Sequence, residues 1–110
     1  MTLLNKCGID NTEMYYLMNH LIIEKIPFQV EADYCGYPQV FYPQRGNCKC
    51  SVICNDVSYG GEQGLLEIMG LLTKEEEECD SVVGYLRAED VLERIKKDYT
   101  GGKQNENVSD

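Results

Sequence analysis

The sequence predicts a single α+β domain with an N-terminal helix, a three- to four-stranded antiparallel sheet and two C-terminal helices. Apolar residues near the N-terminus recur at helical spacing, the central third alternates between apolar and polar residues, and helical spacing returns toward the C-terminus. With 110 residues, the chain is long enough for one modest hydrophobic core. We expect the domain to span residues 1–100 and residues 101–110 to form a disordered acidic tail, because that tail has a single apolar residue.

The first helix is expected to begin near Asp10, which can cap it, with Ile9 and Met14 forming a hydrophobic staple and Glu13 completing a capping box. Pro27 should end this helix. Its apolar stripe consists of Met14, Leu17, Met18, Leu21, Ile22 and Ile26.

The alternating region predicts a meander of three strands over residues 28–34, 37–42 and 48–57. In the first strand, Phe28 and Val30 should face the helix, and Glu31 and Asp33 should face water. Cys35 and Gly36 should form the first turn, and a segment containing Pro43 and Gly46 the second.

The second half is expected to be mainly helical. A glycine-rich turn over residues 58–64 should lead into a helix over residues 65–72. Thr73 and Glu76 fit a capping box for a short acidic turn, and residues 80–86 should be an irregular connection. The last helix should end at Gly101 and Gly102. Its inward positions are Val91, Leu92, Ile95 and Tyr99.

The charge balance favours a basic partner over nucleic acid. The chain has 19 acidic and 10 basic residues, which gives a net charge of −9 at pH 7. Nucleic-acid binders use Lys and Arg to displace phosphate counterions, so an acidic surface disfavours direct nucleic-acid binding. It can attract a basic protein, although solubility alone is the alternative explanation.

The four cysteines of residues 35–54, namely Cys35, Cys48, Cys50 and Cys54, are candidate ligands for a structural zinc ion. Cys50 and Cys54 would lie about 13 Å apart on a straight strand at about 3.3 Å per residue, so a single ion requires a bend. A meander also places Cys48 at the opposite end of the sheet from Cys35 and Cys54, near which Cys7 could serve as a replacement ligand. Buried, unligated thiols are the alternative.

Catalysis has little support in the sequence. His20 is the single histidine and lies within the first predicted helix, and the acidic residues form a run typical of a solvated surface. Cysteine-dominated metal sites are the closed, structural type. We therefore expect the protein not to be an enzyme.

No apolar run approaches the length of about 20 residues that spans a membrane, and the N-terminus lacks the pattern of a secretory signal. A reducing, cytoplasmic location is therefore expected, in which free thiols or metal ligands are more common than disulfides.

The run SYGGEQGLLEIMGLLTKEEE from Ser58, followed by DSVVGYLRAEDVLERI from Asp80, resembles small acidic proteins of phages and prophages of Gram-positive bacteria. The likeness covers about residues 28–99 and is strongest over 58–95. With its cysteine cluster, the chain is similar to a zinc-containing anti-CRISPR inhibitor of the type II RNA-guided nuclease. The resemblance implies binding to the effector–guide RNA complex in the bacterial cytoplasm and interference with target-DNA loading.

An acidic inhibitor of this kind would offer carboxylates to the positively charged channel that holds nucleic acid in the effector. The alternative function is a phage regulatory or interaction module with another host partner and unligated cysteines. The candidate carboxylates are Glu31, Asp33, Glu75, Glu76, Glu77, Glu78 and Asp80.

Overall fold

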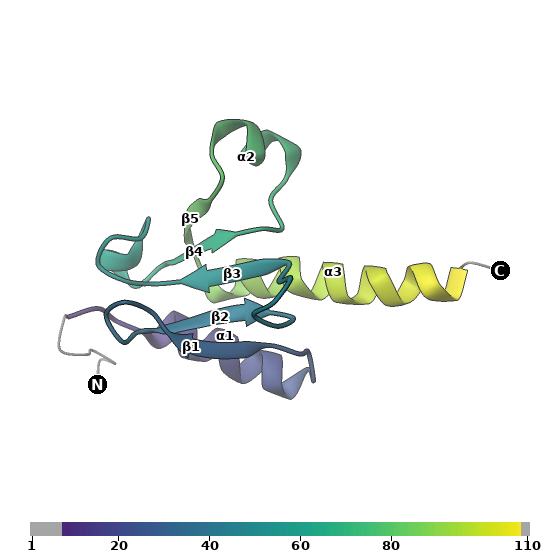
Figure 1. Ribbon diagram of the computed structural model, residues 1–110, viewed down its shortest axis with the longest axis horizontal. Helices are drawn as coiled ribbons and strands as arrows, with labels where there is room; N and C mark the ends of the chain where they lie inside the picture. Colours follow the sequence, from purple (N-terminus) through teal and green to yellow (C-terminus); the bar gives the residue numbers. More distant parts are fainter. Residues whose placement is uncertain (1–7, 109–110) are drawn as a thin grey trace.

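The fold is α+β, with a five-stranded antiparallel sheet and three α-helices (Figure 1). It is taken from a computed structural model that describes residues 8–108, with side chains described through residue 101. In chain order the elements are α1 (Thr12–Ile23), β1 (Gln29–Ala32), β2 (Pro38–Tyr42), β3 (Cys50–Ile53), the 3₁₀ turn η1 (Gly61–Gln63), β4 (Leu66–Met69), α2 (Lys74–Cys79), β5 (Val83–Leu86) and α3 (Ala88–Val108).

The strands pair in sequence order, β1-β2-β3-β4-β5, so every strand lies beside its neighbour in the chain. The register aligns Val40 with Val52 and Val52 with Ile68, and all three are fully buried. Since successive side chains of a strand point to opposite faces, these residues mark the face that the helices cover. The other face is more exposed and carries Glu31, Ser51 and Met69.

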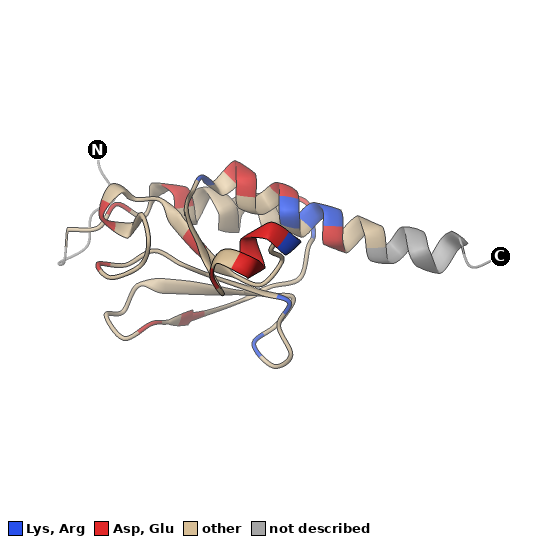
Figure 2. Cartoon of the chain, turned by 90° about the horizontal axis from the view of Figure 1, so that it is seen from above, with Lys and Arg blue, Asp and Glu red and all other residues tan. Residues whose placement is uncertain are grey.

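Helices α1 and α3 pack against each other and cover the same face of the sheet (Figures 1 and 2). Glu13 of α1 joins the two helices, because its Oε1 accepts a hydrogen bond of 2.7 Å from the first backbone N–H of α3, at Ala88. The buried apolar residues form one core of Ile9, Met14, Leu17, Leu21, Ile26, Tyr37, Val40, Tyr42, Cys50, Val52, Cys54, Leu66, Ile68, Ala88, Val91, Leu92 and Ile95.

The first helix is present as predicted, but its N-cap residue differs from the prediction. Asp10 precedes the helix and its Oδ1 accepts from the Thr12 N–H at 2.9 Å, while Asn11 occupies the N-cap position. Helix α1 ends at Ile23, before Pro27. Strand β1 is an edge strand with all four residues exposed, so the predicted half-burial of Val30 is wrong. An edge strand has a neighbour on only one side, which leaves its side chains less covered.

The predicted helix over residues 65–72 is wrong, because Leu66–Met69 forms β4. Leu66 and Ile68 are fully buried while Met69 is exposed, which is the two-residue period of a strand. Gly64 and Gly70, on either side of the strand, have φ angles of 76° and 100°. Backbone in that left-handed region cannot continue a right-handed helix, so the run between the glycines is too short for the predicted element.

Two further boundaries differ from the prediction. Residues 83–86 form the edge strand β5 where an irregular connection was expected, with a bulge in its pairing to β4. The expected helix end at Gly101 and Gly102 is also wrong, since α3 continues to Val108. Residues 109–110 lie outside the described part of the chain, and the domain boundary at residue 100 stays a prediction.

None of the helices within residues 8–108 is both long and apolar enough to cross a membrane.

Candidate functional site

Strand β3 fixes the two buried cysteines. Cys50 begins the strand and Cys54 follows its last residue, and each side chain is 1% exposed. Burial raises the pKa of the Cys50 thiol to about 12 and that of Cys54 to about 11. Desolvation disfavours the thiolate, so both groups are neutral thiols at physiological pH in this arrangement. A thiolate is the form that binds zinc.

The four predicted zinc ligands do not come together. The Cys54 thiol points at backbone carbonyls of Asp10 and Gly61, each 3.9 Å away, at one end of the sheet. Cys50 lies at the other end, where Cys48 and Asp98 are among the groups that raise its pKa. Cys48 is exposed and Cys35 half-buried.

Among the residues described, no three His, Cys, Asp or Glu side chains are grouped closely enough to hold a metal ion. Cys7, the proposed replacement ligand, lies outside the described residues. Cys79 is the exposed last residue of α2. The zinc assignment therefore stays a prediction, and binding by Cys35, Cys48, Cys50 and Cys54 together would require rearrangement of β3 or its flanking loops.

Asp33, one of the predicted partner-binding acids, stabilises the fold instead. Its Oδ1 accepts hydrogen bonds from the backbone N–H groups of Cys35 at 2.9 Å and Tyr37 at 3.0 Å, and its Oδ2 accepts from Asn55 at 3.0 Å. These contacts shape the β1–β2 turn and join it to the end of β3. Glu31 forms an ion pair of 3.2 Å with Arg45 across the neighbouring hairpin, which reduces its availability to a partner.

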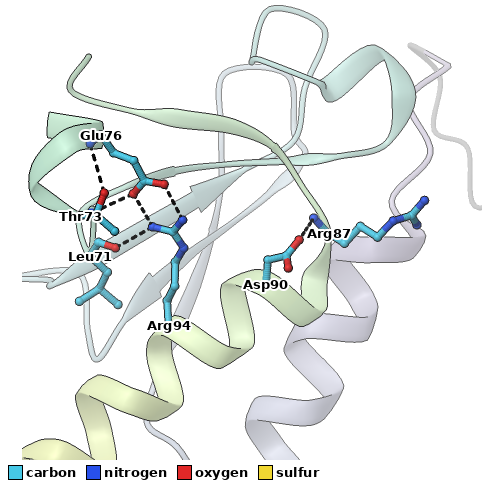
Figure 3. Close-up of polar contacts among 6 residues, drawn as sticks. All are labelled: Leu71, Thr73, Glu76, Arg87, Asp90 and Arg94. Carbon is cyan, nitrogen blue, oxygen red and sulfur yellow. Dashed lines mark hydrogen bonds and ion pairs between the residues drawn. The ribbon is translucent and has the colours of Figure 1, made fainter. Parts of the chain in front are cut away.

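Glu76 also has a structural role (Figure 3). The predicted capping box is confirmed: the Glu76 N–H donates to the Thr73 hydroxyl, and the Glu76 carboxylate accepts from the Thr73 N–H. The same carboxylate receives two hydrogen bonds from the Arg94 guanidinium, at 2.8 and 2.7 Å. The hydrogen bond from Arg94 is the largest cause that lowers the Glu76 pKa, to about 2.

Arg94 additionally donates to the carbonyl oxygen of Leu71 at 3.0 Å (Figure 3). This one side chain of α3 therefore binds both the connection between β4 and α2, at Leu71, and α2 itself, at Glu76. The three remaining glutamates of α2 are exposed. We call Glu75, Glu77 and Glu78 the α2 ridge (Figure 2). Asp80 follows at the C-cap, where its Oδ1 accepts from the Ser81 N–H at 2.6 Å.

His20 is half-buried, and its ring lies against that of Tyr16, tilted by 33°, with the centroids 4.2 Å apart.

A second acidic surface was missed by sequence reasoning. We call residues 55–64, between β3 and β4, the tyrosine loop; it carries Asp56, Tyr59 and Glu62. A signal was present in the sequence, because no Lys or Arg occurs between Lys49 and Lys74. From the sequence, residues 58–64 are predicted only to form a glycine-rich turn.

No protein-family model, curated protein or solved structure matches the chain.

Proposed function

We propose that the protein is a phage-encoded anti-CRISPR inhibitor that binds the type II effector nuclease with its guide RNA and blocks loading of target DNA. The observation that carries the proposal is the α2 ridge. Glu75, Glu77 and Glu78 are exposed, and among residues 8–101 none of them has an ion-pair partner. Exposed carboxylates suit a surface whose Arg and Lys side chains otherwise contact phosphate.

The way α2 is held supports a binding role. An α-helix of six residues has too few internal hydrogen bonds to be stable alone, and like charges close together on its surface repel. The capping box and the Glu76–Arg94 pair offset both effects. The ridge is thus presented in one conformation, which lowers the entropy lost on binding.

Inhibition by occupancy needs no reacting group, and we propose that the protein is not an enzyme. Its site of action is the cytoplasm of the bacterial host, where the effector works.

The alternative function is a phage regulatory or interaction module with a different host partner and unligated cysteines. The positions of the buried Cys50 and Cys54 at opposite ends of β3 favour the second part of that alternative. A structural zinc on Cys35, Cys48, Cys50 and Cys54 is decided by elemental analysis of the purified protein and thermal unfolding after chelation. A stoichiometric zinc whose removal lowers the midpoint supports the metal, and metal-free protein with an unchanged midpoint rejects it.

A plasmid-interference assay tests the inhibitor function, together with a binding assay on the purified effector–guide complex. We expect the protein to restore plasmid survival, with binding that weakens as salt rises. The triple variant E75K/E77K/E78K should bind at least about tenfold more weakly, equivalent to about 1.4 kcal/mol.

The matched control is E89K, which reverses one exposed charge in the first turn of α3. This control should inhibit almost as well as the parent protein. Full inhibition by the triple variant would reject the ridge as the binding surface, and absence of binding by the parent protein would reject the inhibitor function.

A further inference from the structure

The tyrosine loop encloses a small cavity with polar walls. Its volume is about 220 Å³, and residues Asp56, Tyr59, Glu62, Gln63 and Tyr85 are among those lining it. The loop lies at the end of the sheet where β3 ends and β4 begins, at the left of Figure 1. The α2 ridge belongs to a separate segment, between β4 and β5. The cavity is thus a second surface with its own chemistry.

Large aromatic side chains are exposed around this cavity. Tyr59 is 50% exposed, Tyr85 60% exposed, and Tyr34, which contacts Asp56, is 67% exposed. Tyrosine rings at a surface offer a broad apolar face with a negative electrostatic potential above it, and such rings are enriched where proteins bind partners. A cation placed over a ring face is attracted to it.

The charge of the cavity is negative. Asp56 and Glu62 contribute carboxylates, and no Lys or Arg is among the lining residues. Asp56 accepts a hydrogen bond from the Tyr34 hydroxyl, which leaves its second oxygen available. Glu62 has neither a hydrogen bond nor an ion pair within the described part of the chain. The cavity therefore suits a cationic group and repels phosphate and carboxylate ligands.

The backbone beneath the cavity is fixed by buried polar contacts. Oδ1 of the buried Asn55 accepts from the N–H groups of Val57 at 3.0 Å and Ser58 at 2.8 Å, and the Asn55 N–H donates to the Ser58 hydroxyl at 2.8 Å. A Cβ atom at Gly61 would overlap the carbonyl oxygen of Asn55, so the chain passes itself here at backbone contact distance.

The two tyrosines are also joined to each other through the backbone. The Tyr85 N–H donates to the Tyr59 carbonyl at 3.1 Å, and a Cβ at Gly84 would overlap the side chain of Tyr59. Tyr85 itself has a φ of 59°, in the left-handed region that a bulky residue rarely adopts. Non-glycine residues held there are strained and cluster at functional sites.

We propose that this cavity binds an arginine side chain of a partner protein, gripped between Tyr59, Tyr85 and the carboxylates of Asp56 and Glu62. A guanidinium is planar, stacks on aromatic rings and donates in a fork that matches carboxylate oxygens, whereas a lysine ammonium is a more strongly hydrated point charge. The combination of exposed rings and unneutralised carboxylates therefore selects arginine over lysine. This proposal and the proposed function have one assumption in common, which is that the partner is positively charged.

The test is an NMR titration of the full chain with a short acetylated and amidated peptide, Gly-Arg-Gly-Arg-Gly, against the same peptide with lysine. We expect saturable shifts in the amide signals of the tyrosine loop, with the arginine peptide binding at least fivefold more tightly. E62Q should weaken binding about tenfold. Y59L, which removes the ring, should weaken it by a similar factor.

The control is E89Q, which removes one exposed charge from α3, outside both acidic surfaces, and should leave peptide affinity unchanged. Glu62 makes no contact that supports the fold, so E62Q isolates the binding effect. Equal affinity for the two peptides, unchanged affinity in E62Q, or shifts confined to the α2 ridge would each overturn the proposal. Because the peptide assay contains no effector, it gives its result whether or not the anti-CRISPR function holds.

Discussion

The two acidic surfaces of this protein carry the same sign of charge but are held in place by different forces. The tyrosine loop is fixed by neutral hydrogen bonds of the buried Asn55 and Ser58 and by close backbone packing at Gly61. The α2 ridge stands on a six-residue helix held by a capping box and the ion pair of Glu76 with Arg94. One surface rests on buried hydrogen bonds, and the other rests largely on a partly exposed ion pair.

Because of this difference, the two surfaces should respond differently to salt and to acid. Buried neutral hydrogen bonds do not titrate and are little affected by salt, because solvent ions do not reach them. A partly exposed ion pair weakens in salt and is lost when its carboxylate is protonated. The Asn55–Ser58 hydrogen bonds should therefore persist at salt concentrations that weaken the Glu76–Arg94 pair. In acid the contrast is smaller, because the carboxylates of Asp33 and Glu67 also accept hydrogen bonds from the tyrosine loop, from Asn55 and from the Tyr59 N–H.

The largest effect should come from Gly61→Ala in the tyrosine loop. The added Cβ would overlap the Asn55 carbonyl oxygen and the Ser58 hydroxyl, so the loop must shift and lose buried hydrogen bonds. We expect a loss of about 3 kcal/mol in the free energy of unfolding, measured by urea denaturation. Gly46→Ala is the control and should change stability by under about 0.5 kcal/mol, since open space surrounds that position. Similar stability of the two variants would contradict the close packing.

A smaller effect is expected from Arg94→Ala, which removes the contacts of α3 to Glu76 and to the Leu71 carbonyl. The loss should be about 1–2 kcal/mol, because the pair is only partly buried. Hydrogen exchange should speed up in α2 while the tyrosine loop keeps its protection. Lys97→Ala, one turn away and exposed, serves as the control. Equal acceleration in both segments would show that they are not independently held.

Acid should weaken the contact that holds α2. The folded-state pKa of Glu76 is lowered to about 2 from an ordinary value of 4.5, so its stabilising contribution is complete above about pH 4.5 and disappears as the pH falls toward 2. We expect this contribution to be about 1 kcal/mol after solvent screening. Comparison of the pH dependence of unfolding with that of Glu76→Gln isolates it. Parallel curves for the two proteins between pH 5 and 2 would contradict the assignment.

The prediction that perturbs the protein least concerns the alkylation rates of two thiols. Cys54 is buried where the tyrosine loop begins and its pKa is raised to about 11, whereas Cys79 ends α2 and is exposed. Iodoacetamide at neutral pH should alkylate Cys79 of the native protein at least about 100-fold faster than Cys54, because the thiolate is the nucleophile and access is required. Peptide mass spectrometry over time measures the two rates. Comparable rates would show that the end of β3 opens readily.

The first half of the fold was predictable because its local patterns are unambiguous. The apolar stripe of Met14, Leu17 and Leu21 has the helical period, and residues 28–42 alternate with turn residues between them. Residues 65–72 were not predictable by the same rule, since their apolar residues fit a helix and a buried strand equally well. What distinguishes the strand from a helix here is the left-handed backbone of the flanking Gly64 and Gly70.

The candidate sites depended on contacts distant in sequence. The sequence predicted the capping role of Glu76 but not its pairing with Arg94, 18 residues away, nor the bond between Asp33 and Asn55, 22 residues away. The cysteine cluster suggested proximity because its members are close in sequence, but an extended strand separates Cys50 from Cys54. The tyrosine loop went unrecognised because Tyr85 joins it from β5.

The order of the strands also determines how the chain assembles during synthesis. Every sheet pairing joins neighbours along the chain, so each pair of strands can form without waiting for later strands. Helix α3, which completes the cover over Val52 and Ile68, is the last element to emerge. The nascent sheet therefore has an apolar face that only α1 covers until α3 has been synthesised, and exposed apolar surface of this kind favours aggregation.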